Sequence, residues 1–431
     1  MLMLVLGMGL IALIGFIAYQ HRVRVVNDAL ATLVDPYHVE LQSIDFEKLG
    51  VARVKGVTLT PKFVDREFPL AYLEEVLITY DFDTIRHSGK LKSISIEKPT
   101  VHLDEKMFEA FTAPDPDKAS EEPSPQFDLE ILSRFTDSFD AREGRLILDL
   151  PWHPPVTTDW EFHSGPIQFD DKGLLVTPLE LDLRDLRFGE RGEAGHIDRF
   201  FVKTRVNRNF SHIEVDDLLI EKPEIAFTPA WLSPVKKAAA SSSIQEGQVD
   251  DPTGLNQKTE TESSPFVLVF NRAKINEADL SVLGFDKEAG RGLVPDLKLS
   301  GALDLADIAL RNGKWSSRDE ISLDLKHLFV GAGDEAVFEG RPIHLSADSL
   351  QDLIENQRIK TLEVGEATIT VSDKSLSQFK SDKSESNSES NAEPSPAGIG
   401  SVSIEKGTFV MKDFAPGGKE MPEVQTGFSG E

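Results

Sequence analysis

Short runs in which apolar and polar residues alternate cover most of the chain, and one interrupted form of this alternation recurs. In Leu91–Leu103 (LKSISIEKPTVHL) the alternation runs to Ile96, stops at Pro99 and then resumes. Leu218–Phe227 (LLIEKPEIAF) and Leu362–Val371 (LEVGEATITV) repeat this type 1 pattern, with proline and alanine respectively at the break. A period of two residues is typical of β-strands that have one apolar and one polar face, so the pattern predicts β-structure.

A type 2 pattern has glycine or alanine at the break and occurs at Phe139–Leu148, Ala273–Val282 and Val402–Met411. In both types the break changes the phase of the alternation. Ile96 and Val101, for example, are five positions apart, an odd step that would place them on opposite faces of an uninterrupted strand. A tight turn or a β-bulge would reset the phase, and glycine suits both because it adopts positive φ readily. The sequence leaves these two alternatives open.

Three segments are rich in Ser, Pro, Glu and Asp and poor in large apolar residues: 113–126, 233–265 and 374–398. Such segments bury too little apolar surface to offset the entropy of ordering, so we predict that they are disordered. Each one follows a type 1 pattern and precedes a type 2 pattern. This placement indicates insertions within a β unit, and it favours one continuous sheet over separate domains.

The fold class predicted from these features is mainly β, with tandem antiparallel β units that form an elongated twisted sheet or groove. Few short helices are expected, and 128–139 and 349–356 are the best candidates. The predicted organisation is, in order, a transmembrane anchor (1–19), a short helical connector (20–36) that Asn27 can cap, a first β unit (37–112), a disordered insertion (113–126), a second β unit (127–232), a disordered insertion (233–265), a third β unit (266–373), a disordered insertion (374–398) and the start of a further, truncated β unit (399–431).

The N-terminal segment Met1–Tyr19 (MLMLVLGMGLIALIGFIAY) has no charged side chain. As a helix rising ~1.5 Å per residue it would reach about 28 Å, close to the thickness of a hydrocarbon core. We expect a retained anchor; a cleaved signal peptide is the alternative, but a basic N-terminal region and a clear cleavage site are missing. His21, Arg22 and Arg24 follow the segment and, by the positive-inside rule, oppose the translocated body that we expect. The anchor is represented by Leu4, Leu6, Leu10, Leu13 and Phe16.

Charge and cysteine content narrow the function classes. The formal net charge of −27 makes nucleic acid an improbable partner, because binding to its backbone requires clustered Lys and Arg. The same acidity keeps a long β surface soluble. The chain has no cysteine, so it has neither disulfides nor thiol chemistry.

Familiar catalytic and cofactor motifs are absent from the sequence. The sequence contains no nucleophile elbow, P-loop, dinucleotide fingerprint or HExxH motif. The densest polar cluster is His153, Asp159, Glu161 and His163, in the stretch PWHPPVTTDWEFH. A metal or acid/base site there is conceivable, but a loop between strands is the favoured interpretation. We therefore expect a protein that is not an enzyme and that holds no metal or cofactor.

Several segments together resemble the AsmA-like family of bacterial envelope proteins. They are the N-terminal apolar helix, GVARVKGVTLTP (Gly50–Pro61), the IEKPTVHL segment that starts at Ile96, and EGRLILDL (Glu143–Leu150). The resemblance implies a long twisted β-sheet curled into a groove, whose apolar interior holds or conducts phospholipid between the inner and outer membranes. It also implies a single-pass anchor in the inner membrane and a body in the periplasm.

The function expected from the alternation and the resemblance is binding or transport of phospholipid acyl chains, or assistance in outer-membrane assembly. The expected partners are the inner membrane, through the N-terminal helix, phospholipid, and other envelope proteins. The alternative is a non-catalytic scaffold of closed β-sandwich modules, which would show identical alternation. The candidate lipid-facing residues are Ile94, Ile96, Val101, Leu103, Leu218, Ile220, Ile225, Phe227, Val364 and Ile369.

Overall fold

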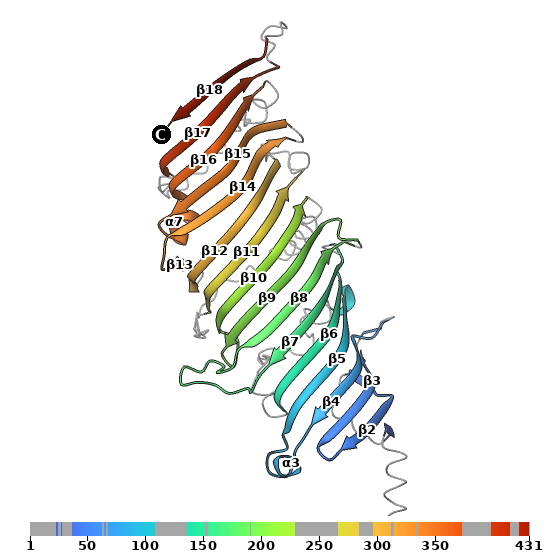
Figure 1. Cartoon of the computed structure of the whole chain (residues 1–431). Coiled ribbons are helices and arrows are strands. Elements are labelled where there is room, and N and C mark those ends of the chain that lie inside the picture. The colour runs from blue at the N-terminus through green and yellow to red at the C-terminus, as the bar shows by residue number, and fades with distance from the viewer. Residues whose placement is uncertain are drawn as a thin grey trace, which may run out of the picture. The chain divides into compact units, whose positions relative to one another are not determined.

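The structure is a computed structural model in which β-strands predominate (Figure 1). It describes residues 23–24, 27, 37–62, 64–65, 68–107, 136–150, 154–189, 191–228, 266–283, 296–311, 314–332, 335–372, 398–413 and 422–430. The eighteen strands of these residues belong to one mixed sheet. The chain divides into two compact units: unit 1 comprises Met1–Leu150 and Pro155–Leu183, and unit 2 comprises Pro151–Pro154 and Arg184–Glu431.

In unit 1 the strands follow one another in chain order across the sheet. Their bounds are β1 (Tyr37–Glu40), β2 (Ser43–Lys48), β3 (Val51–Pro61), β4 (Ala71–Thr79), β5 (Leu91–Asp104), β6 (Thr136–Asp149) and β7 (Val156–Ser164), and helix α3 (Phe82–Ser88) joins β4 to β5. β1 and β2 lie end to end along β3, because Val39 pairs with Leu59 and Ile44 pairs with Val54. The strand pairs from β1 to β7 are antiparallel except for β5 and β6, which are parallel.

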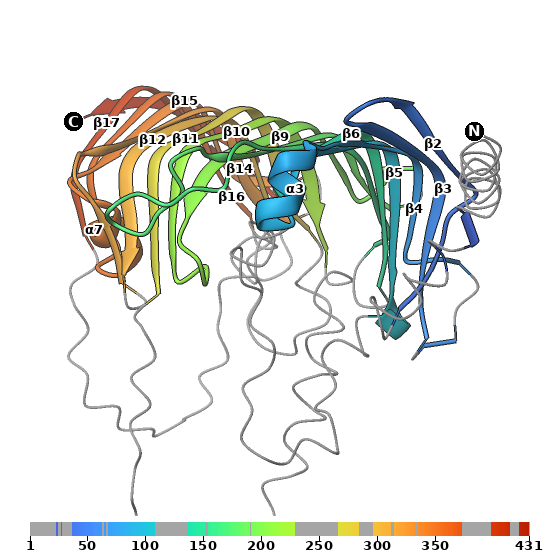
Figure 2. The same cartoon turned by 90° about the horizontal axis from the view of Figure 1, so that it is seen from below.

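Unit 2 repeats this arrangement. Its strands are β9 (Gly195–Val206), β10 (His212–Phe227), β11 (Val267–Val282), β12 (Asp296–Arg311), β13 (Lys314–Ser317), β14 (Ile321–Ala332), β15 (Glu335–Ala347), β16 (Arg358–Val371), β17 (Gly398–Met411) and β18 (Val424–Gly430), and β8 (Leu179–Phe188) spans the division between the units. β13 and β14 lie end to end along β12. β10 pairs with β11 in parallel, and so does β16 with β17. Figure 2 shows that the long strands of each unit bend along their length.

The three parallel pairs join the type 1 patterns to the type 2 patterns. Ile96 of β5 pairs with Ala141 of β6, and Ile220 of β10 pairs with Ile275 of β11. The prediction that the strands on either side of a gap belong to one sheet is therefore confirmed. The prediction of antiparallel units is wrong at these three places. Alternation has the same period in both arrangements, and a connection of a dozen or more residues permits parallel pairing.

Each interrupted pattern lies within a single continuous strand, and β5, β6, β10, β11 and β17 have a local distortion at the break. Lys98 and Lys222 have left-handed backbones, with φ of 50° and 46°. In β6 the residues Arg142 and Glu143 lie between the pairs Ala141–Phe162 and Gly144–Trp160, so two residues oppose one. This is the geometry of a β-bulge, and the register also shifts at the breaks of β11 and β17. In β5 and β10 the register is the same on both sides of Lys98 and Lys222, so the bulge belongs to the type 2 pattern.

The distortion resets the phase, so that apolar residues on both sides of it share one face. In β4, which pairs with β5 around its break, Leu73 and Val76 are three positions apart, yet both belong to the same hydrophobic cluster. Val364 and Ala367 in β16 show the same relation in unit 2. The apolar face therefore continues across the break in these strands.

The glycines of the type 2 pattern serve a different purpose from the expected one. Gly144 and Gly407 do not have positive φ; in β6 it is the preceding residue, Glu143, that has φ of 51°. A Cβ atom at Gly144 would lie 2.5 Å from the ring of Trp160, and one at Gly407 would collide with the ring of Phe428. Glycine is needed here because an aromatic ring on the neighbouring strand covers the backbone.

The two helix predictions had different outcomes. Helix α7 (Leu350–Ile354) lies inside the predicted segment 349–356, and Ser349 caps it by accepting a hydrogen bond from the Asp352 N–H. The described part of the predicted helix 128–139 belongs instead to strand β6. There, pairing with β5 and β7 overrides the local preference of the sequence.

The predicted insertions lie outside the described residues, except for Gly398, which begins β17. In the part of the chain that the structure describes, no helix is long and apolar enough to cross a membrane. The predicted anchor Met1–Tyr19 is not in that part.

Candidate apolar binding face

The hydrophobic core of unit 1 lies on one face of its sheet, and we call this surface the apolar face of unit 1. Paired residues point to the same side of a sheet, and Val54 pairs with Val76, which pairs with Ile96. The buried members are Leu41, Ile44, Val54 and Val76, and the partly buried residues packed against them are Val23, Val57, Leu73, Ile78, Ile94 and Ile96.

A side chain from the N-terminal part of the chain holds the bend between β1 and β2. Asn27 accepts a hydrogen bond from the backbone N–H of Leu41 (2.9 Å) and donates one to the Leu41 carbonyl (3.2 Å). Leu41 is buried, so these backbone groups need partners. Asn27 is itself helical, and the short helix 28–34 that it was predicted to cap lies outside the described residues.

Unit 2 has an equivalent surface, the apolar face of unit 2. Its row Leu325–Ile343–Val364–Ile404 crosses four strands through three successive pairs. The buried members are Leu325, Ile343, Val364 and Ala367, and the partly buried residues packed against them are Leu299, Leu323, Leu328, Phe338, Leu362 and Ile404.

The candidate lipid-facing residues differ in accessibility. Val364 is 2% exposed and packs wholly among protein side chains, whereas Phe227 is exposed. Ile94 and Ile96 belong to the apolar face of unit 1 and Val364 to that of unit 2. The partly buried candidates are Ile94, Ile96, Val101, Leu103, Leu218, Ile220, Ile225 and Ile369.

The candidates of unit 2 have apolar neighbours across the strands. Ile220 pairs with Phe200 on β9 and with Ile275 on β11. Ile369 pairs with Phe338 on β15 and with Phe409 on β17. Such cross-strand contacts stabilise a sheet and also make each row a continuous apolar strip.

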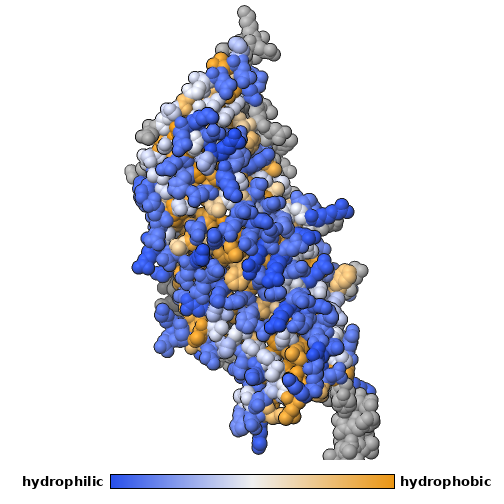
Figure 3. Space-filling model, in the orientation of Figure 1, coloured by the Kyte–Doolittle hydropathy of each residue, from blue (hydrophilic) through white to orange (hydrophobic). Residues whose placement is uncertain are grey.

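Charged side chains form ion pairs across neighbouring strands. Lys98 lies 3.4 Å from Glu74, Lys222 lies 3.2 Å from Asp198, and Lys406 lies 3.1 Å from Glu366. Figure 3 shows that hydrophilic residues dominate the surface turned to the viewer in Figure 1. Solvated cross-strand pairs of this kind keep one face of an amphipathic sheet in water.

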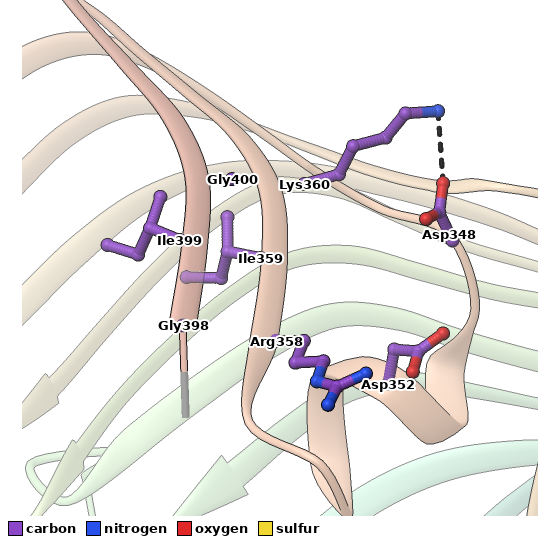
Figure 4. A pocket seen from close by; sticks show the side chains of 8 residues that line it. All are labelled: Asp348, Asp352, Arg358, Ile359, Lys360, Gly398, Ile399 and Gly400. Atoms are coloured by element: carbon purple, nitrogen blue, oxygen red, sulfur yellow. Dashed lines mark ion pairs between the residues drawn. The ribbon is translucent and has the colours of Figure 1, made fainter. Parts of the chain in front are cut away.

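A hollow of about 490 Å³ lies beside α7 and the first residues of β16 and β17 (Figure 4). Lys360 forms ion pairs of 3.0 Å with both Glu320 and Asp348, and these carboxylates raise its pKa. Asp352 has a lowered pKa because Ser349 and Asn356 donate hydrogen bonds to it. The lining combines four charged residues with two isoleucines and two glycines and contains no candidate lipid-facing residue: Asp348, Asp352, Arg358, Lys360, Ile359, Ile399, Gly398 and Gly400.

The polar cluster singled out in the sequence lies on a strand and not in a loop. Asp159, Glu161 and His163 belong to β7, and His153 lies outside the described residues. His163 forms a hydrogen bond with the carboxylate of Asp140 on β6. Within the described ranges, no group of three or more His, Asp or Glu side chains is placed to hold a metal ion.

These features define a class, a curved amphipathic β-sheet protein with one apolar face in each unit. The chain matches no protein-family model, and no curated protein matches its sequence.

One exposed apolar cluster was missed by the sequence analysis. Asp81 stands before helix α3 and caps it by accepting a hydrogen bond from the Thr84 N–H at 3.0 Å, and Asp83 lies in its first turn. Gly89 ends the helix with φ of 69°. An Asp cap followed eight positions later by glycine was the available signal.

Proposed function

We propose that the protein is a membrane-anchored, non-catalytic envelope protein whose apolar faces bind phospholipid acyl chains. Through this binding it would convey lipid between membranes or assist outer-membrane assembly. One observation carries the proposal: the described strands belong to a single sheet, and the candidate residues on its central strands, such as Ile96 and Ile220, are only partly buried. In a closed sandwich a second sheet would bury them.

The energy of such binding is sufficient without a specific pocket. Shielding one methylene from water is worth ~0.8 kcal/mol, so shielding ten would supply roughly 8 kcal/mol before the costs of binding. Continuous strips such as Phe200–Ile220–Ile275 offer contacts that do not depend on the lipid headgroup. Non-specific holding of this kind suits transport. The resemblance to AsmA-like proteins and the apolar segment Met1–Tyr19 support the envelope location and the anchor.

A second candidate function is a structural or interaction scaffold. The full burial of Val364 among Leu325, Ile343 and Ala367 favours it, because that cluster is satisfied by protein side chains alone. Under this alternative the partly buried strips are covered by protein rather than by lipid.

Site-specific photo-crosslinking tests the proposal. A photoreactive side chain at Ile96 or Ile220 should form lipid adducts that mass spectrometry identifies, whereas one at Glu221, the residue next to Ile220 in the alternating strand, should not. Protein purified in mild detergent should also carry phospholipid. Absence of both adducts and co-purifying lipid would contradict the proposal.

The variant Ile220→Asp separates the two functions. If the strip holds lipid, the protein should keep its fold and lose the lipid adducts at a neighbouring position. If the strip is a closed core, the buried unpaired charge should unfold unit 2. Circular dichroism of the variant distinguishes these outcomes.

A further inference from the structure

Four exposed apolar side chains gather at one end of unit 1, and we call this cluster the apolar tip. Its members are Phe46 on β2, Leu49 in the turn between β2 and β3, and Phe82 and Ile85 on α3. Leu49 is 85% exposed and Phe82 is 56% exposed. Single exposed apolar residues are common on protein surfaces. A cluster of them bordered by polar residues, in contrast, marks a site of interaction.

Backbone contacts join the two segments of the apolar tip. The N–H of Tyr80, at the end of β4, donates a hydrogen bond of 2.8 Å to the carbonyl of Gly50, which follows Leu49. A Cβ at Gly50, whose φ is +85°, would lie 2.8 Å from the Tyr80 carbonyl oxygen. The rings of Tyr80 and Phe82 stand edge to face with their centres 5.3 Å apart. The turn and α3 therefore form one surface.

Helix α3 contributes no buried side chain to the hydrophobic core. None of its residues is buried, although it carries Phe82 and Ile85 one turn apart. Its stability comes from its ends, where Asp81 accepts from the Thr84 N–H and the Gly89 N–H donates to the Ile85 carbonyl at 2.8 Å. Apolar residues on a helix that covers no sheet indicate a partner outside this unit.

The charge around the apolar tip differs from that of the whole chain. The chain carries a net charge of −27, whereas residues 46–50 and 80–92 have four Lys and Arg against three Asp and Glu. Of these acids, Glu47 pairs with Arg53 at 2.6 Å and Asp81 is engaged by the helix cap. The basic residues are Lys48, Arg86, Lys90 and Lys92, of which Lys90 pairs with Asp137 at 2.5 Å. Basic groups beside apolar ones fit the headgroup region of an anionic bilayer.

The chain also holds unit 1 close to the predicted anchor. Val23 packs against the apolar face of unit 1, and only three residues separate it from Tyr19, where the apolar segment ends. Three extended residues reach roughly 10 Å. If the segment spans the bilayer, unit 1 lies at the membrane surface, where one of its ends can touch the lipid.

We propose that the apolar tip docks onto the surface of a bilayer that contains anionic phospholipid, with Leu49 and Phe82 inserted among the headgroups. This proposal rests on the anchor of the proposed function but not on lipid binding by the apolar faces. A docked tip orients unit 1 on the membrane, since the tether alone would let it rotate. Phe46 also connects the tip to the apolar face, because it pairs with Ala52 and Ala52 pairs with Ile78.

The absence of cysteine makes a direct test possible. The full chain carrying Leu49→Cys or Phe82→Cys is labelled with a polarity-sensitive fluorophore and reconstituted into vesicles of phosphatidylethanolamine and phosphatidylglycerol. Lipids that carry a quencher near the headgroup should reduce the emission roughly twofold or more, because the label lies in the interface. Phe68→Cys is the matched control: Phe68 is 53% exposed and lies before the opposite end of β4. Its emission should not change.

A second variant tests the apolar contact itself. Phe82→Glu should abolish the quenching of a label at position 49, whereas Phe68→Glu should leave it intact. Equal quenching at positions 49 and 68, or none at positions 49 and 82, would overturn the proposal. Crosslinks between two protein copies at position 49 without lipid quenching would also overturn it, since the tip would then be a dimer contact.

The result separates this proposal from the proposed function. Quenching at position 49 without lipid adducts at Ile220 would support membrane docking by the apolar tip and contradict lipid binding by the apolar face. Lipid adducts at Ile220 without quenching at position 49 would do the reverse.

Discussion

The side-chain amine of Lys222 lies 3.2 Å from the carboxylate of Asp198, across the antiparallel pair β9 and β10. In unit 1 Lys98 and Glu74 repeat this relation across β4 and β5, at 3.4 Å. Both lysines have positive φ and both precede a proline. The break in the alternation is thus the same structural device in both units, and the ion pair marks its polar side.

The backbone of Lys222 predicts an unusual preference for glycine. A non-glycine residue with left-handed φ carries roughly 1 kcal/mol of strain, so Lys222→Gly should be more stable than Lys222→Ala by about that amount. Urea unfolding followed by circular dichroism measures the difference. Lys274, which lies in β11 without positive φ, is the control, and there alanine should be more stable than glycine. Equal stability of the two Lys222 variants would contradict the prediction.

The contact between Gly144 and Trp160 predicts a steric cost. Gly144→Ala would place a Cβ against the indole ring and should lower the free energy of unfolding by about 1–3 kcal/mol. Combining it with Trp160→Ala should cost less than the sum of the two single changes, because the ring is gone. Gly430→Ala serves as the control, since no atom lies within 4 Å of a Cβ there. Additive effects in the double variant would show that the ring is not the cause.

Burial separates two neighbouring candidates on β16. Val364→Ala should destabilise the protein by about 2 kcal/mol, because it opens a cavity among Leu325, Ile343 and Ala367. Ile369→Ala should lower the free energy of unfolding by less for each methylene removed, since Ile369 is only partly buried. Denaturant titration of both variants measures this order, and a reversed order would be inconsistent with the described core.

The carboxylate of Glu366 predicts a change of stability in acid. Its pKa is lowered because Lys406 donates a hydrogen bond to it and Arg341 lies nearby. A folded-state pKa below the ordinary value stabilises the folded state above that value, and this stabilisation is lost as the pH falls through the folded pKa. The difference in stability between the protein and Glu366→Gln should therefore shrink below about pH 4.5.

A pH titration of Glu366 by NMR checks the same prediction directly. Lys406→Met should move the titration midpoint of Glu366 upward, because the main hydrogen-bond donor is removed. An unchanged midpoint in this variant would exclude Lys406 as the cause.

The sequence was a good guide to the strands and to one core row. Alternation located Ile96, which the register places in one row with Val54 and Val76 on one face. It could not reveal the parallel pairing of β5 with β6, because side chains alternate identically in both directions. The left-handed backbone at Lys98 could not be predicted either. Proline at the next position indicated a disruption of the strand but did not specify its conformation.

The candidate surface was predicted in part. Ile94 and Ile96 do lie on the apolar face of unit 1, but Val364 is enclosed, since burial depends on neighbours from three other strands. The apolar tip was not predicted from the sequence, because Phe82 and Ile85 lie in a helix of only seven residues, which is too short to show helical periodicity.

The parallel pairing sets a limit on how far the chain can be shortened. Leu91 pairs with Thr136 and Asp104 pairs with Asp149, so a chain that leaves Asp104 must return along the whole length of β5 before β6 can begin. An extended residue covers at most ~3.3–3.6 Å, and β5 has 14 residues, so an engineered linker would need at least about as many residues as the strand itself. The same rule holds between β10 and β11 and between β16 and β17. Trimming any of these connections below that length would force the second strand to reverse its direction or leave the sheet.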